Sequence, residues 1–227
     1  MTISGFEPKQ RLLLVLAEQL KMPLLQIARS AELEQFGEVA TTADVALKLI
    51  DSYILSIMPH QTELALEPVS AAAVLQDVAH ELSKFANQYD CKLKLDISGK
   101  YQPVMANRQN LMSAYTMLGY SFIEAQSVDD QTPTIVLAAH KSGQGLVAGV
   151  FSEQADLSGD MYRRAKALYG TTRQPLTSLS SVAGAGVFIA DSLMQAMATP
   201  LHPSHHHKLS GLAATLLPSQ QLQFYVS

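Results

Sequence analysis

Residues 17–24 read Ala-Glu-Gln-Leu-Lys-Met-Pro-Leu and lie in the middle of an amphipathic pattern. Around this stretch, apolar residues recur every three or four positions, at Leu13, Leu16, Leu20, Leu24, Ile27 and Ala31. This spacing places them on one side of an α-helix. Pro8 suits the first helical turn, and Gly37 after Phe36 suits the end of a helix. The segment therefore predicts a helix from Pro8 to Phe36.

A second apolar stripe follows after a short connection, at Ala43, Ala46, Ile50, Ile54 and Ile57. Thr41 and Thr42 can cap the start of this helix, and Pro59 ends it. Two helices joined so closely run antiparallel, but two stripes alone bury too little apolar surface. We expect two chains to form a four-helix bundle, in a homodimer whose interface is Leu13, Leu16, Leu20, Leu24, Ile27, Ile50, Ile54 and Ile57. The alternative is that the stripes pack onto the second domain of the same chain.

Within residues 17–24, Leu20, Lys21, Pro23 and Leu24 match the H-box of sensor histidine kinases, which runs roughly Ser-His-Glu-Leu-Lys-Thr-Pro-Leu. The segment resembles that box, but Glu18 stands where the family carries its phospho-acceptor histidine. A carboxylate cannot form the phosphoramidate that an imidazole nitrogen forms. The resemblance therefore implies the kinase fold without its nucleophile. The family also has a proline at this point, so we favour one kinked helix over two separate helices.

Later segments resemble the same family in the correct order and cover nearly all 227 residues. Leu64 to Val69 resembles the link into the ATPase-like domain, and residues 103–107 resemble the strand and loop before its N-box helix. Gly184 to Val187 resembles the Gly-Leu-Gly-Leu box, and Gly211 to Pro218 the closing strand. The layout is also similar to that of bacterial histidine phosphotransferases. The resemblance implies an α+β chain, with a helical hairpin over residues 1–62 and an α/β sandwich of the kinase ATPase type over 63–227.

The residues of the second part support that order of elements. A helix is expected over Ala72 to Gln88, and alternating runs predict strands at Lys92–Ile97, Thr134–His140, Leu146–Phe151 and Leu212–Leu217, with a possible addition at Leu222–Val226. Between His140 and Leu146, Ser-Gly-Gln-Gly is good chemistry for a hairpin turn. A further helix is expected over Val187 to Met197.

The nucleotide contacts that the resemblance implies are mostly missing. Tyr120 falls where the N-box asparagine would bind magnesium, and a phenol does not replace an amide as a ligand of a hard cation. After the strand ending at Phe151, no Asp-x-Gly-x-Gly box follows, and Glu153 and Asp156 are out of register. Gly184 and Gly186 remain before a helix, where glycines can admit a phosphate, but close packing explains them better. We expect no nucleotide cofactor and treat these two glycines as vestigial.

The remaining basic residues and histidines do not require a phosphate-binding or metal-binding site to explain them. Residues 159–181 correspond to the family's lid and include a short basic helix, which we interpret as a solvated face. His80 is interpreted as an ordinary residue on a helix surface. His202, His205, His206 and His207 lie in a proline-interrupted segment, Thr199 to Ser210, that we expect to be a solvated loop. A metal site needs fixed geometry and supporting hydrogen bonds, so no metal site is predicted there.

Composition narrows the class of protein. Nearly half of the residues are hydrophobic and 16% are charged, which favours packed structure over disorder. A net charge of −4 without a basic stripe argues against nucleic acid as a partner. No apolar run reaches the length of a membrane span and no signal sequence is evident, so a cytoplasmic protein without a membrane or sensor module is expected.

Three hypotheses for function remain open. The first is a catalytically inactive, kinase-like docking module in two-component signalling, with a response-regulator receiver domain as its partner. The family binds receivers beside the acceptor, which places the docking surface near Glu18, Lys21, Met22, Leu25 and Arg29. The second is an enzyme, either a divergent kinase or a phosphotransferase that uses another histidine. The third is a structural or assembly protein that inherited the fold.

Overall fold

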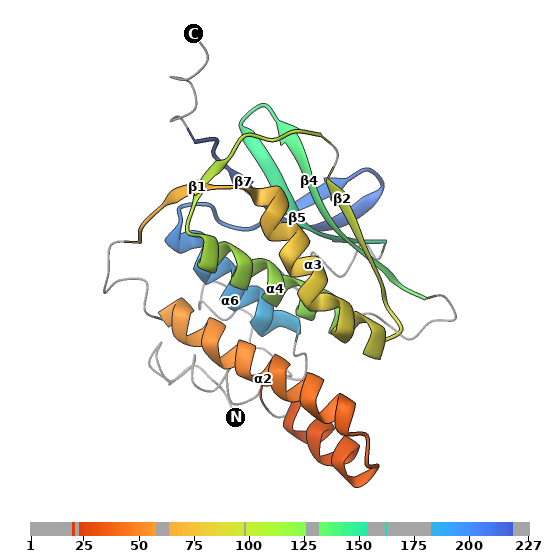
Figure 1. Cartoon of the computed structure of the whole chain (residues 1–227). Coiled ribbons are helices and arrows are strands. Elements are labelled where there is room, and N and C mark those ends of the chain that lie inside the picture. The colour runs from red at the N-terminus through yellow and green to blue at the C-terminus, as the bar shows by residue number, and fades with distance from the viewer. Residues whose placement is uncertain are drawn as a thin grey trace, which may run out of the picture.

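The computed structural model describes residues 20, 23–57, 64–97, 99–125, 132–153, 162 and 183–219. A helical hairpin lies against one side of a second unit, in which helices cover one face of a mixed β-sheet (Figure 1). None of the helices in these ranges is long and apolar enough to cross a lipid bilayer. This is the α+β architecture that the sequence predicts.

The hairpin consists of a helical segment over residues 23–32 and helix α2, Phe36–Ile57. The chain reverses at Glu34, which has a positive φ of 57°. The amide of Gln35 donates to the carbonyl of Ser30 at 2.8 Å, and the hydroxyl of Ser30 donates to Glu38 at 3.2 Å. The two helices are therefore joined by a tighter and earlier turn than expected.

The predicted boundary between the two helices is wrong. Gly37 does not end the first helix, and Thr41 and Thr42 do not cap the second, because all three lie inside α2. The Thr41 hydroxyl instead donates to the carbonyl of Gly37, at 3.0 Å, within the helix. A glycine in a helix interior costs only about 1 kcal/mol relative to alanine, so it need not act as a stop. Pro59 lies outside the described residues.

Helix α2 presents two apolar sides. Val45, Leu49 and Tyr53 are buried in the same core as the second unit, where α2 contacts helices α3, α4 and α6. Ile50 and Ile54 lie on a different side of the helix, and Ile54 is 44% exposed. The alternative that the hairpin packs onto its own chain is therefore correct for one side of α2. The other side remains available to a second molecule.

The main sheet has the strand order β2-β4-β5-β7-β6. Strand β2 pairs in parallel with β4, and the other neighbours are antiparallel. The four predicted strands are confirmed, with slightly different ends: β2 Lys92–Ile97, β4 Thr134–Ser142, β5 Gly145–Ser152 and β7 Leu209–Leu216. A small second sheet pairs β1, Glu67–Val69, with β3, Val104–Ala106. The possible strand Leu222–Val226 lies outside the described residues.

In the described part of the chain, three helices cover one face of the sheet: α3 Ala71–Gln88, α4 Arg108–Glu124 and α6 Ala183–Ala196. Ser70 caps α3 and Asn107 caps α4, each accepting a hydrogen bond from the backbone three residues later. Every residue of α4 from Ala114 to Ile123 is buried. A helix that is covered all round carries no polar stripe, which explains why α4 shows no clear amphipathic pattern.

The histidine-rich segment is a β-hairpin, so the expectation of a solvated loop from Thr199 to Ser210 is wrong. Strand β6, His202–His206, pairs antiparallel with β7 across a turn at His207 and Lys208. β6 is an edge strand, which tolerates Pro203 because one row of its backbone groups has no partner in the sheet. Strong pairing with β7 thus overrides the local loop signals.

The sheet face away from the helices has a small apolar cluster of its own. Its buried members are Val136, Ala138, Val147, Phe151 and Ala213, with Leu209 packed against them. In Figure 1 the β6–β7 hairpin, in blue, reaches across this part of the sheet toward β2. The sheet is therefore curled, and residues of its two edge strands approach each other over this cluster.

Candidate functional site

The acceptor segment is only partly described. Glu18, Lys21 and Met22 lie outside the described residues, as do the interface candidates Leu13 and Leu16. Pro23 is buried, and helix continues from it to residue 32. The kink expected at Pro23 stays a prediction, because the residues before it are not described.

Two docking candidates lie on the surface of the hairpin. Leu25 is 63% exposed, and Arg29, one turn later on the same side of the helix, is also exposed. In a continuous helix, positions 18, 22, 25 and 29 form one stripe, because they are spaced by three or four residues. The described end of that stripe is therefore accessible to a partner.

The candidate dimer residues fall into two groups. Leu24 and Ile54 are exposed, whereas Leu20, Ile27 and Ile50 are half-buried. The side chain of Ile57 lies outside the described part of the structure. Leu47, which the sequence analysis did not include, is 59% exposed and shares the side of α2 that carries Ile50 and Ile54. The hairpin thus has exposed apolar side chains on both of its helices.

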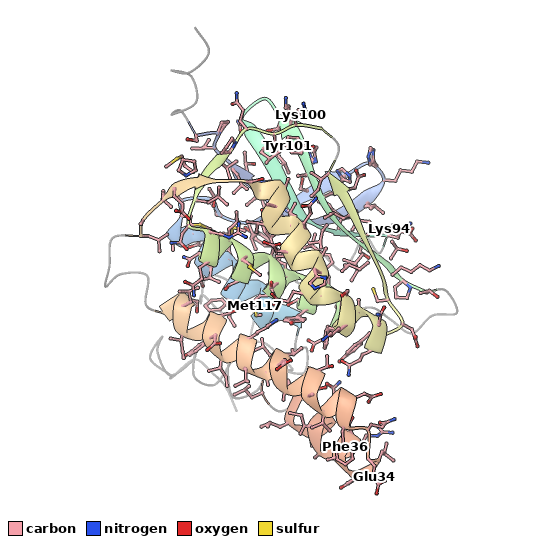
Figure 2. The ribbon with its side chains drawn as sticks, in the orientation of Figure 1. Glu34, Phe36, Lys94, Lys100, Tyr101 and Met117 are labelled. Carbon is pink, nitrogen blue, oxygen red and sulfur yellow. The ribbon has the colours of Figure 1, made fainter. Side chains whose placement is uncertain are left out.

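A polar cleft of about 430 Å³ lies next to this surface. Arg29, Ser30 and Leu33 line it from the hairpin, and Gln88 and Tyr89 line it from the end of α3. The side-chain amide of Gln26 donates to the Tyr89 hydroxyl at 2.8 Å, which ties the first helix to α3. The far end of the hairpin, marked by Glu34 and Phe36 in Figure 2, projects away from the sheet.

Helices α4 and α6 approach each other closely at Gly186. A Cβ atom built on Gly186 would lie 2.2 Å from the Ser121 hydroxyl oxygen and 3.1 Å from the carbonyl oxygen of Met117. Met117 is labelled within the helical layer in Figure 2. A side chain at residue 186 would therefore require Ser121 to move and would press against the Met117 carbonyl. Gly186 therefore permits the close approach of α4 and α6.

Both glycines of the expected box lie within α6, which begins at Ala183, rather than before it. The prediction that this helix starts at Val187 is therefore wrong at its N-terminal end. Small residues at 183–186 permit the helix to start early, since alanine is the best helix former and glycine removes the steric conflict with α4.

Tyr120 packs against α3. Its ring packs edge-on against Phe85 of α3, with the ring centroids 4.8 Å apart. Burial raises the pKa of Tyr120 far above its usual value of 10, and the negative charges of Glu81, Asp44 and Glu124 raise it further. The residue is a buried neutral phenol at the meeting point of α2, α3 and α4.

The α4 residues that face Gly186 are Met117 and Ser121, which the sequence analysis did not single out. They are four positions apart and therefore lie one turn apart on the same side of α4. Sequence spacing alone could not tell which of two adjacent residues, Tyr120 or Ser121, points at α6.

Glu124 is the last residue of α4, and its charge acts on Tyr89 and Tyr120. Burial raises the pKa of Glu124 from its ordinary value near 4.5 to about 7. The charge of Glu124 in turn contributes to the raised pKa of Tyr89, for which burial is the main cause. This carboxyl group therefore changes charge in the neutral pH range.

The groups present in the described residues do not fit a magnesium nucleotide. At Gly186 of α6, helix α4 presents the backbone carbonyl of Met117 and the hydroxyl of Ser121, and neither is the side-chain amide that the sequence analysis looked for. Glu153 follows β5 as an exposed residue, without a glycine beside it. Asp156 and the lid region 159–181, apart from Tyr162, lie outside the described residues.

No protein-family model and no curated protein matches the sequence. Solved structures do resemble it. The histidine kinase AdeS of Acinetobacter baumannii is 13% identical with a TM-score of 0.55, and the match covers 88% of this chain and 94% of that one.

Two further solved structures match different shares of the chain. Full-length ShkA, solved in complex with AMPPNP, has a TM-score of 0.52 at 14% identity, and the match covers 94% of this chain but 47% of ShkA. The catalytic domain of histidine kinase ThkA has a TM-score of 0.50 at 9% identity, and 67% of this chain covers 95% of it. The larger matches extend beyond a catalytic domain alone. The chain therefore has the fold of a histidine kinase, with a helical hairpin followed by an ATPase-like unit.

Proposed function

We propose that the protein is a catalytically inactive, histidine kinase-like module that works as a homodimer and docks a response-regulator receiver domain. The observation that carries the proposal is the division of the hairpin surface. One side of α2 packs on its own chain through Val45, Leu49 and Tyr53, while Leu47 and Ile54 on another side stay exposed.

An exposed apolar side on a helix is typical of a binding surface. A second copy of the chain is the occupant we infer, because both helices of the hairpin contribute exposed apolar residues. Four helices from two chains would cover Leu24, Ile50 and Ile54 together. The dimer would leave the stripe at Leu25 and Arg29, with the adjacent cleft, for a receiver domain.

The loss of reactive groups supports a binding role over catalysis. Glu18 stands at the acceptor position, and a carboxylate cannot form the phosphoramidate that the histidine of this family forms. Tyr120 stands at the expected N-box position with its ring packed against Phe85, and a buried neutral phenol is a poor ligand for magnesium. The first helix contains no histidine before Phe36.

Direct binding to receiver domains from the same genome tests the proposal. We expect at least one receiver to bind the full-length protein, and we expect Leu25→Asp and Arg29→Glu to weaken that binding. Ile54→Asp serves as the matched control, since it charges the dimer surface rather than the docking stripe. If no receiver binds, or if both stripe variants bind as well as the wild type, the docking proposal fails. Transfer of labelled phosphate from ATP to the protein would instead support an enzyme.

A further inference from the structure

Four polar residues, from three strands and one turn, meet on the sheet face away from the helices. Asp96 lies on β2, His140 on β4, His206 at the end of β6, and His207 in the following turn. β2 and β6 are the two edge strands of the sheet, so Asp96 and His206 meet only because the sheet curls over the Phe151 cluster. This contact joins residues that are 110 positions apart in the sequence.

Three of these side chains converge on one point. His206 Nε2 lies 3.0 Å from Asp96 Oδ2, and His207 Nε2 lies 3.5 Å from the same oxygen. One ligand atom from each of the three residues lies within 4.8 Å of the others. For a tetrahedral zinc ion with bonds of roughly 2.0–2.1 Å, neighbouring ligand atoms are about 3.3 Å apart. The two distances from Asp96 Oδ2, 3.0 Å to His206 Nε2 and 3.5 Å to His207 Nε2, are close to that value.

The central ligand is held in place by its neighbours. The side chain of His206 is only 8% exposed, and its ring stacks on His140 and packs against Phe151. Its Nδ1 lies 3.2 Å from Nδ1 of His140. If Nε2 of His206 directs its lone pair at an ion, its proton lies on Nδ1, and Nδ1–H can donate to Nδ1 of His140. Histidine ligands in metal sites usually have such a partner on the second nitrogen, which fixes ring and tautomer.

The third ligand comes from a turn position with unusual backbone geometry. His207 has a φ of 53°, in the left-handed region where hairpin turns favour Gly, Asn or Asp. Its side chain is 75% exposed yet reaches back to the Asp96 oxygen. The β6–β7 hairpin thus fixes the positions of His206 and His207, which a loop would not do.

We propose that Asp96, His206 and His207 form a binding site for a divalent transition-metal ion, with Zn²⁺ as the best-suited ion. Two imidazoles and one carboxylate favour zinc over magnesium and calcium, which prefer sets made only of oxygen ligands. Three protein ligands leave a fourth position that faces solvent beside His207. The ion would fasten the β6–β7 turn to β2, and thereby join the two edges of the sheet.

Metal titration of the full-length protein tests this inference. The protein is prepared without an affinity tag of histidines, stripped with chelator, and titrated with Zn²⁺ by calorimetry at pH 7.5. We expect one bound ion per chain and a higher melting temperature with zinc, because a ligand stabilises the state that it binds. Cobalt in the same site should give the visible absorption of a four-coordinate ion.

Variants separate the site from incidental histidine binding. His207→Ala changes an exposed residue and Asp96→Asn keeps the side-chain size, so both variants should fold. Each should weaken zinc binding at least ~10-fold and remove the cobalt band. His205→Ala, an exposed residue one position before His206, and His80→Ala on α3 are the matched controls and should bind as the wild type does.

Three results would overturn the inference. The first is no zinc binding by the wild type. The second is binding that survives both His207→Ala and Asp96→Asn. The third is an equal loss in His205→Ala, which would mean that the strand's histidines bind metal without the Asp96 geometry.

Discussion

Lys48 on α2 and Glu81 on α3 form an ion pair in which Nζ lies 2.7 Å from Oε1. The pair ties the hairpin to the ATPase-like unit at the edge of a shared apolar core that includes Leu49 and Tyr53. The Lys48 side chain is partly exposed, so the pair itself adds little to the free energy of unfolding. Burial of the apolar side of α2 provides most of the attachment. This attachment decides which side of α2 remains for a partner.

Charging the exposed side of the hairpin should weaken the dimer. Ile54→Asp removes an apolar contact worth ~1.5–3 kcal/mol and places a charge in the interface. Leu20→Asp should act similarly on the first helix. Light scattering at micromolar concentration should show a dimer for the wild type and monomer for these variants. Ile54→Leu keeps the apolar surface and should remain dimeric. A wild-type monomer under these conditions would contradict the proposed dimer.

Mg-ATP should not bind appreciably. Tyr120 stands at the position of the N-box asparagine, and no Asp-x-Gly-x-Gly box follows β5. Calorimetry should therefore show no binding heat, and the melting temperature should stay constant, since only a bound ligand shifts it. An increase of several degrees in millimolar Mg-ATP would restore the kinase hypothesis.

Exposure to phosphorylated receiver domains should leave no acid-labile phosphoryl group on the wild-type protein. Glu18→His supplies an imidazole at the acceptor position, and phosphate transfer to that variant is the expected result if docking is intact. Glu18→Gln is the matched control and should not accept phosphate. Phosphorylation of the wild type would contradict the binding-only proposal, whereas failure of Glu18→His would show that the docking geometry has been lost.

Glu124 should make the free energy of unfolding depend on pH. Its pKa is about 7 in the folded protein and near 4.5 when unfolded, so the folded state binds the proton more tightly. This stabilisation is complete below pH 4.5 and is lost as pH rises through 7. Glu124→Gln cannot ionise, so it should gain ~1–3 kcal/mol relative to the wild type at pH 8 and little at pH 4.5. Denaturant unfolding at both pH values measures the difference.

Several charged groups surround Glu124 and enter this interpretation. The charge of Glu124 raises the pKa of both Tyr89 and Tyr120. The carboxylates of Asp44 and Glu81 also act on Tyr120, and Glu81 is paired with Lys48. An equal gain from Glu124→Gln at pH 4.5 and pH 8 would mean that packing, rather than ionisation, is responsible.

Gly186→Ala should destabilise the protein by ~1–3 kcal/mol, because its Cβ atom would overlap the Ser121 hydroxyl. Ser121→Ala removes that oxygen and should recover part of the loss in the double variant, although the Met117 carbonyl remains close. Gly37→Ala is the control within α2, where no atom lies within 4 Å of the added methyl group. It should stabilise by ~0.5–1 kcal/mol through helix propensity. An additive double variant would argue against a direct contact between residues 121 and 186.

The sequence by itself determined the order of the elements, because their signals are local. The two apolar runs at Thr134 to Ser142 and Gly145 to Ser152, with a turn between them, are recognisable from nearby residues alone, and the structure confirms that hairpin. The caps at Ser70 and Asn107 are also local features, although the sequence analysis did not single them out. The apolar stripes also predicted two helices in the hairpin, although not the turn at Glu34.

Tertiary structure alone decided the contacts between distant segments. It turned Tyr120 toward Phe85 and Ser121 toward Gly186, a difference of one residue that depends on how α3 and α6 pack around α4. It also drew His202–His206 into the sheet as an edge strand, through pairing with β7 that no local pattern signals. Asp96 and His206 meet because the whole sheet curls. Such contacts depend on side-chain packing and sheet curvature, which no short stretch of sequence encodes.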